Sequence, residues 1–145
     1  MSVIFSRACE YAVRGLVEMA RNPEKGSWTV PEVAEQSNTP APFLAKTFQQ
    51  LVKGGLLHSA KGRKGGFSFA RPPEQIFLID IVNIIDSTTL THDCALGMPE
   101  CHDDNPCPFH VQWKRVRVPL IEALSQESIA HLAKQPRPKR KSEPT

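Results

Sequence analysis

Residues 91–110, THDCALGMPECHDDNPCPFH, gather the side chains of this chain that are best suited to holding a metal. They include three of the four cysteines, Cys94, Cys101 and Cys107, and His110 follows the last of these by three positions. Thiolates and imidazoles are ligands of zinc and of iron–sulfur clusters. The segment has too few apolar residues to form core and is too irregular for a helix, so we expect a metal-binding loop.

The spacing Cys94-x6-Cys101-x5-Cys107-x2-His110 leaves three kinds of site open. A structural zinc site usually contains one tight pair of cysteines, which is missing here, although Cys107 and His110 are close enough to supply two ligands. A disulfide beside a free thiol is disfavoured in a reducing cytoplasm. An iron–sulfur cluster tolerates wider spacing because its thiolates surround a larger object, and the spacing slightly favours it over zinc.

Length and composition predict one compact cytoplasmic domain. A chain of 145 residues buries about 70% of the surface that its unfolded form exposes, so it needs neither disulfide nor metal merely to fold. The first residues, MSVIFSRACEYAVRG, carry Arg7 and Glu10 and lack the apolar run of a signal peptide. No stretch approaches the ~18 apolar residues of a membrane span, and we expect no membrane partner.

Charge is unevenly distributed along the chain. The last twelve residues, KQPRPKRKSEPT, carry a net charge of +4, which leaves −1 for the rest. Such a Pro-rich basic tail is expected to be disordered and either attracts nucleic acid nonspecifically or only aids solubility. Residues 53–71 hold five basic residues and no acid, whereas residues 91–110 hold four acids. The two segments are therefore expected to serve different partners.

The N-terminal half predicts helices with clear starts and stops. Ser6 caps a first helix that runs to about Ala20. Thr29 and Glu32 form a capping box for a second helix, with Pro31 in its first turn, and Ser37-Asn38 makes the following turn. Thr39 is expected to cap a third helix, with Pro40 at its first position.

The third predicted helix has an apolar face and a polar face. Leu44, Phe48, Leu51 and Val52 form a stripe that must face a core. The opposite face is small, amide-bearing or cationic, which suits a DNA major groove, because Gln can pair with adenine and Lys with guanine or phosphate. An ordinary solvated face is the alternative on this helix alone.

A basic hairpin after this helix favours DNA binding. Gly54-Gly55 ends the helix, and strands over 56–60 and 67–71 are joined by the turn KGRKGG. Two helices, a short turn and a basic hairpin make a winged helix-turn-helix, so the predicted fold is mainly α with a small β-hairpin wing. The predicted DNA-binding residues are Thr39, Pro42, Ala45, Lys46, Gln49, Lys53, Arg63 and Lys64.

The C-terminal half predicts an apolar helix over 76–86, the cysteine loop, a long helix over about 108–124 and a short terminal helix. An apolar stripe recurs at helical spacing on the long helix, and we expect a second copy of the chain to pack against it: Phe109, Trp113, Val116, Leu120 and Leu124. Pro119 should kink or split this helix. The expected organisation is a DNA-binding domain (1–86), a cluster loop (87–110), dimerisation and terminal helices (111–133) and a tail (134–145).

Three motifs together resemble those of the IscR/NsrR/RirA-type (Rrf) family of bacterial transcription regulators. They are YAVRGL in the first helix, KGRKGGF in the wing, and three cysteines that lead into a C-terminal helix starting CPFHVQW, and the resemblance covers about residues 3–133. It implies a homodimer that binds double-stranded operator DNA, as a repressor, and whose affinity follows the state of an iron–sulfur cluster. It implies neither an enzyme nor a small-molecule substrate.

The resemblance also implies the ligands of that cluster. Cys94, Cys101 and Cys107 match the family's three thiolates. The fourth ligand in the IscR-like branch matches His110 and accompanies a 2Fe–2S cluster, while in other branches it is an acid from the partner subunit, here Glu10, with a 4Fe–4S cluster. We prefer His110 with 2Fe–2S. A structural zinc protein whose winged helix contacts other proteins is the alternative function.

Two departures from the family pattern limit what can be carried over. The first cysteine gap is one residue longer than in some branches, and Ala45 stands where IscR-like chains carry a Glu that discriminates operators. Cys9, the remaining cysteine, lies in the first helix, where packing as a small apolar residue is its expected role.

Overall fold

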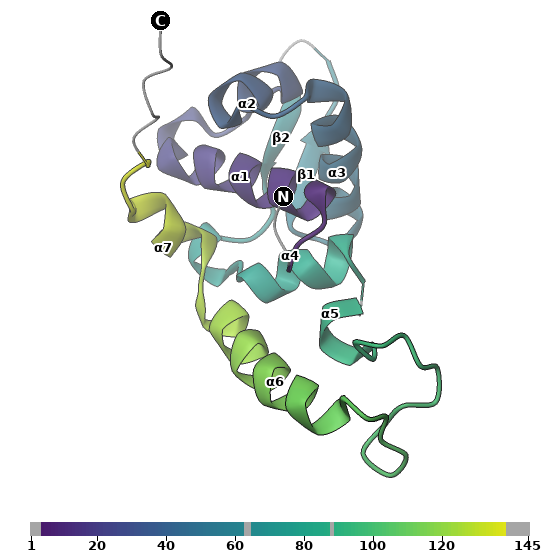
Figure 1. Cartoon of the computed structure of the whole chain (residues 1–145). Helices are drawn as coiled ribbons and strands as arrows, with labels where there is room; N and C mark the ends of the chain where they lie inside the picture. The colour runs from purple at the N-terminus through teal and green to yellow at the C-terminus, as the bar shows by residue number, and fades with distance from the viewer. Residues whose placement is uncertain (1–3, 63–64, 88, 139–145) are drawn as a thin grey trace, which may run out of the picture.

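The computed structural model describes residues 4–62, 65–87 and 89–138, and these form a mainly helical fold with one small hairpin (Figure 1). The elements are α1 (Arg7–Arg21), η1 (Pro23–Lys25), α2 (Val30–Ser37), α3 (Ala41–Lys53), β1 (Leu57–Ala60), β2 (Gly66–Phe69), η2 (Pro73–Gln75), α4 (Leu78–Ile85), α5 (Thr89–His92), α6 (His110–Gln126) and α7 (Ile129–Lys134). The predicted fold class, a winged helix-turn-helix with a long C-terminal helix, is confirmed.

The helices α1 and α2 begin as their caps predict. Ser6 Oγ accepts a hydrogen bond of 3.1 Å from the Cys9 N–H, which satisfies one of the free donors at the start of α1. The Thr29–Glu32 capping box is also present, because Glu32 Oε2 accepts from the Thr29 N–H at 2.8 Å and Thr29 Oγ1 from the Glu32 N–H at 3.4 Å.

The predicted cap of α3 is wrong. Thr39 is only 8% exposed, and its hydroxyl lies 2.9 Å from the Ser37 hydroxyl instead of capping the helix. Its N–H donates to the Ala34 carbonyl at 3.0 Å, which holds Thr39 inside the turn. The helix therefore begins later, at Ala41, and Pro42 rather than Pro40 lies in its first turn.

The wing packs on the helix-turn-helix through aromatic side chains. The hairpin pairs Leu57 with Phe69, and β2 also forms a bridge to Trp28 ahead of α2. The Phe67 ring lies edge-on to Phe48 of α3 at 5.3 Å between centroids. The wing is thus anchored in the core, although the predicted tip residues Arg63 and Lys64 lie outside the described residues.

The last helix returns to the winged domain. The α7 helix packs against α1 and η2, and Figure 1 shows the chain leaving the body through α5 and the cysteine loop and returning along α6 to α7. Ile129 donates its N–H to the Ile76 carbonyl at 2.8 Å, and Leu78 donates to the Glu127 carbonyl at 2.9 Å. Hydrogen bonds therefore join the chain at the start of α4 to the chain at the start of α7, although α5, the cysteine loop and α6 lie between them in the sequence.

The long helix α6 differs from its prediction in two ways. It runs without a break through Pro119, so the expected split does not occur. Its apolar residues do not share one environment, because Leu124 is buried, Trp113 and Leu120 are partly buried, and Val116 is 57% exposed. Among the described residues, no helix has the length and apolar character needed to cross a membrane.

Candidate metal centre and nucleic-acid interface

The three loop cysteines converge in space. Their Sγ atoms all lie within 4.8 Å of one another, and the Sγ atoms of Cys94 and Cys107 are 3.5 Å apart. The backbone N–H of Cys107 also points at Cys101 Sγ, at 3.4 Å. Each thiol is half-buried, which leaves it reachable from solvent. Three thiolates at this distance form a ready donor set for a soft metal.

Hydrogen bonds within the loop hold this geometry. Gly97, with φ of +74°, donates its N–H to the Cys94 carbonyl at 2.9 Å, so the chain turns sharply after the first cysteine. Between the second and third cysteines, His102 and Asn105 form a backbone bridge, and the Asn105 side chain donates to the Glu100 carbonyl at 2.8 Å. The turn residues seen in the sequence therefore bring together three thiols that are separated by five and six residues along the loop.

His110 lies at the edge of the thiol group, at the start of α6. Its Nδ1 is 3.2 Å from Cys101 Sγ, and its Nε2 is 2.8 Å from Asp103 Oδ1. Asp103 in turn accepts from Lys114 Nζ at 3.0 and 3.1 Å. A carboxylate on the far nitrogen orients an imidazole toward a metal. Sequence reasoning missed Asp103, although its position between Cys101 and Cys107 was a signal.

Local hydrogen bonds give the thiols different acidities. Bonds from backbone N–H groups, led by that of Met98, lower the pKa of the Cys94 thiol to about 7. Loss of hydration raises the pKa of Cys107. Bonds from His110 and then Lys114 lower the pKa of Asp103, which keeps it an acceptor. Near neutral pH, Cys94 therefore offers the thiolate that metal binding requires.

Trp113 brings a buried donor to the same place. It lines the small cavity that Cys94, Cys101, Cys107 and His110 also line. Its indole Nε1 is buried and has no hydrogen-bond partner within the described part of the chain. A buried unpaired donor costs about 1–3 kcal/mol. An acceptor in this cavity would remove that cost.

Neither Glu10 nor His110 belongs to the group of ligand atoms that lie within 4.8 Å of one another, which contains the three cysteines. Glu10 is half-buried in α1, whereas a hydrogen-bond contact joins His110 to Cys101. His110 is thus the predicted fourth ligand that the fold of one chain places beside a cysteine.

The exposed face of α3 carries most of the predicted DNA-binding residues. Pro42, Lys46, Gln49 and Lys53 are exposed and Ala45 is partly exposed, whereas Thr39 is buried in the turn. Phe43, which sequence reasoning missed, is 62% exposed, and its ring lies 6.3 Å from that of Tyr11. An exposed aromatic ring at the start of this helix adds apolar contact area to a polar face.

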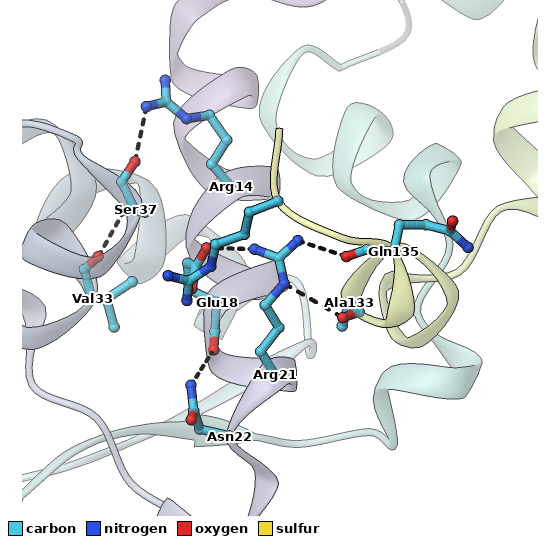
Figure 2. Close-up of polar contacts among 9 residues, drawn as sticks. Arg14, Glu18, Arg21, Asn22, Val33, Ser37, Ala133 and Gln135 are labelled. Atoms are coloured by element: carbon cyan, nitrogen blue, oxygen red, sulfur yellow. Dashed lines mark hydrogen bonds and ion pairs between the residues drawn. The ribbon is translucent and has the colours of Figure 1, made fainter. Parts of the chain in front are cut away.

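Arg14 of α1 fixes the turn between α2 and α3. Its Nη2 donates to the Ser37 carbonyl at 2.8 Å and to the Asn38 carbonyl at 3.0 Å, as Figure 2 shows for Ser37. Asn38 itself adopts the left-handed conformation, with φ of +53°. Arg14 therefore sets the direction in which α3 leaves the turn. No local sequence pattern predicts this contact.

The sequence matches a known family over almost its whole length. The family model, Rrf2, is described as an iron-dependent transcriptional regulator and matches residues 5–135. A candidate HTH-type transcriptional regulator of Aquifex aeolicus (strain VF5) is 35% identical over 132 residues, which cover 90% of this chain and 91% of the relative.

Solved structures share the fold. The chain is similar to CymR (YrzC), the global cysteine regulator of B. subtilis, with a TM-score of 0.74, 20% identity, and coverage of 91% of this chain and 97% of that one. It is also similar to T. potens IscR, with a TM-score of 0.71, 24% identity, and coverage of 92% and 88%.

Proposed function

Because the chain belongs to the Rrf2 family of transcriptional regulators, which are not enzymes, we propose that it is a homodimeric repressor whose operator affinity depends on an iron–sulfur cluster in the cysteine loop. The observation that carries this proposal is the convergence of Cys94, Cys101 and Cys107 within 4.8 Å. The family description as iron-dependent supports iron over zinc.

His110 is the proposed fourth ligand. Its Nδ1 lies 3.2 Å from Cys101 Sγ, and the bond to Asp103 leaves that nitrogen directed at the thiols. One imidazole beside three thiolates suits a 2Fe–2S cluster. Glu10 from the partner subunit, with a 4Fe–4S cluster, is the competing ligand set.

The chemistry of the cavity fits such a group. A cluster presents sulfur atoms that accept hydrogen bonds, and the unpaired Trp113 indole N–H lines the cavity where they would lie. The thiol of Cys94, with a pKa of about 7, is available as a thiolate. When bound, the cluster supplies a redox-active centre that also reacts with nitric oxide. The chain's residues supply its binding and its access to solvent.

The loop is placed to influence DNA binding through α6. His110 is the first residue of α6, and α6 packs against α4, which contacts both α1 and α3. Ordering the loop therefore fixes the start of α6 relative to the DNA-binding body. In a dimer joined through α6, this sets the angle between the two α3 helices, which must meet grooves about one helical turn apart.

The first experiment is anaerobic purification with a UV–visible spectrum and iron, sulfide and zinc determination on the same sample. We expect a brown protein with iron and sulfide that bleaches under nitric oxide. Cys101→Ala should lose the colour, while the matched control Cys9→Ala, which removes a fully buried thiol outside the loop, should keep it.

Operator binding by the same variants tests the regulatory part. In the native protein the operator affinity should differ between the cluster-loaded and the cluster-free state. The Cys101→Ala variant should bind the operator with one affinity, whether or not it has been subjected to cluster reconstitution. If the native protein binds the operator equally tightly with and without its cluster, the cluster does not control operator binding. A colourless native protein with stoichiometric zinc would favour the structural zinc alternative.

A further inference from the structure

An exposed aromatic ring stands at the start of α3. Phe43 is the third residue of that helix, and its side chain has the largest exposed fraction, 62%, among the large hydrophobic side chains of the described residues. A phenyl ring left in water forgoes the stability that burial would give it. The fold alone therefore does not account for this residue.

Contacts with α1 support the ring of Phe43. Its centroid lies 6.3 Å from that of Tyr11, with the two planes tilted by 45°, which is a favourable aromatic arrangement. The Arg14 Cζ atom lies 5.9 Å from the Tyr11 centroid, and the same arginine binds the turn before α3 (Figure 2). The buried Thr47 hydroxyl donates to the Phe43 carbonyl at 2.8 Å. The ring is thus held by the protein on one side while most of it remains exposed.

The charges beside the ring favour a polyanionic partner. The α3 helix carries Lys46 and Lys53 and no acidic residue. Lys46 is exposed and follows Phe43 by three positions, so the two side chains are neighbours on the helix surface. The centres of protein–protein interfaces are depleted in charged residues, whereas DNA binding pairs cations with phosphates. This surface therefore fits DNA better than an apolar protein.

The position of the ring within α3 indicates which part of the DNA it meets. In a helix-turn-helix, the N-terminal residues of the second helix contact the base edges in the major groove. The apolar group that base pairs present there is the C5-methyl of thymine. Ala41, Pro42 and Ala45, the neighbours of Phe43 on the exposed surface, have short side chains. Phe43 therefore has the reach and the apolar surface that a methyl contact needs.

We propose that Phe43 is a specificity-determining residue that packs on the C5-methyl group of a thymine in each half of the operator. The inference rests on the proposed operator binding. A contact with a phosphate carries no sequence information, whereas a contact with this methyl distinguishes thymine from the other bases. Phe43 thus adds a base preference that the lysines of α3 cannot supply through phosphates.

The test removes the methyl group from the DNA and the ring from the protein. The native full chain, purified anaerobically, first enriches a duplex from a random-sequence pool. Each thymine of that duplex is then replaced in turn by deoxyuridine, which lacks only the C5-methyl. Fluorescence anisotropy gives the affinity of the native chain, Phe43→Ala, Phe43→Leu and the control Lys53→Gln for every duplex. The control removes a charge from α3 and leaves the Phe43 ring in place.

We expect one thymine in each half of the duplex to depend on Phe43. Replacing it with uracil should weaken binding by the native chain about fourfold, the effect of exposing one buried carbon. Phe43→Ala should bind the thymine duplex at least as weakly as the native chain binds the uracil duplex, and it should bind both duplexes equally. Phe43→Leu should keep part of the preference for thymine. Lys53→Gln should weaken binding and keep the full preference.

Several results would overturn this role of Phe43. These are a native chain that binds all uracil duplexes as tightly as the thymine duplex, and a Phe43→Ala variant with the native preference at every thymine, which would place the ring on the sugar–phosphate backbone or away from DNA. Thermal unfolding of both Phe43 variants should match that of the native chain, because the ring is exposed. If the native chain enriches no duplex, the proposed operator binding itself fails.

Discussion

At the scale of single residues, the unpaired indole N–H of Trp113 makes a sharp prediction. Trp113→Phe removes a buried donor that has no partner in the described chain, so its effect on the unloaded protein should stay within about 1 kcal/mol, since lost ring area is offset by removal of the unpaired group. In the loaded protein the same change removes a donor to sulfur, and cluster loss should be several-fold faster.

Chemical denaturation of the unloaded variant and absorbance decay of the loaded variant measure the two effects. His131→Phe, an exposed site on α7, serves as a control remote from the cavity. Equal destabilisation of both states by Trp113→Phe would mean that the residue only fills space.

Residues whose role depends on near neighbours were predictable, and residues with remote partners were not. The spacing of Cys94, Cys101 and Cys107 was enough to predict a metal site, and their convergence is observed. The pairing of Glu18 with Arg137 joins residues far apart in the chain, and no local pattern reports it. Thr39 was mis-assigned because a hydroxyl before a helix has two possible partners, the helix end or the preceding turn.

At the scale of elements, the capping box of α2 should carry measurable stability. Thr29→Ala removes the hydroxyl that accepts from the Glu32 N–H, and we expect a loss of about 1 kcal/mol in the free energy of unfolding. Thr29→Ser, which keeps the hydroxyl, should lose much less. Urea denaturation distinguishes the two, and equal losses would contradict a capping role.

The same box predicts a pH dependence. The Thr29 N–H, followed by the side chain of Lys25, lowers the pKa of Glu32 below its ordinary value of 4.5. A lowered pKa means that the carboxylate stabilises the fold above pH 4.5 and that this contribution is lost as the pH falls through the folded-state value. Glu32→Ala should therefore be less stable than the native chain at pH 7, and the gap should narrow below pH 4.5. If the difference in stability between the two proteins does not change with pH, the charge of Glu32 is not its cause.

The junction of α3 and α4 depends on a glycine. A Cβ on Gly54 would lie 2.5 Å from the Ile84 Cδ1 atom, so Gly54→Ala should cost about 1–3 kcal/mol through overpacking. Ile84→Ala in the same chain should recover part of that loss. Thermal unfolding of the two single variants and the double variant measures the coupling, and strict additivity would rule out the steric contact.

Element types and order were predictable because apolar periodicity and capping residues are local signals. The helices over 6–20, 29–53 and 76–86 and the hairpin were all expected. The short α5 helix was not expected, because four residues are too few to show a helical periodicity. The packing of α7 on α1 was not expected either, because the sequence of one segment does not show which distant segment it contacts. The long helix was expected to present one apolar stripe, but part of that stripe contacts the chain's own body.

At the scale of the whole molecule, the exposed valines of α6 predict the proposed dimer. Val111, Val116 and Val118 are 53%, 57% and 43% exposed, more apolar surface than one solvated helix needs. Val111 and Val118 are seven residues apart and share one face of α6, so Val111→Asp combined with Val118→Asp should convert the protein to a monomer, because like charges would face each other across the interface. Light scattering after size-exclusion chromatography measures the mass.

The control places the same two charges elsewhere. His58→Asp with Ser59→Asp changes two exposed residues of β1 and should leave a dimer intact. A valine variant that keeps the native mass would remove α6 from the interface, and a native monomer would refute the dimer itself.

The backbone bonds that join residues 76–78 to residues 127–129 have an evolutionary consequence. The chain leaves the body for α5, the cysteine loop and α6, and it re-enters beside the point from which α4 began. Closing a longer or shorter excursion between two joined ends changes the folding free energy only slowly with length. Descendants of one ancestor can therefore exchange, enlarge or discard the segment that carries the three cysteines while inheriting the same winged helix-turn-helix core.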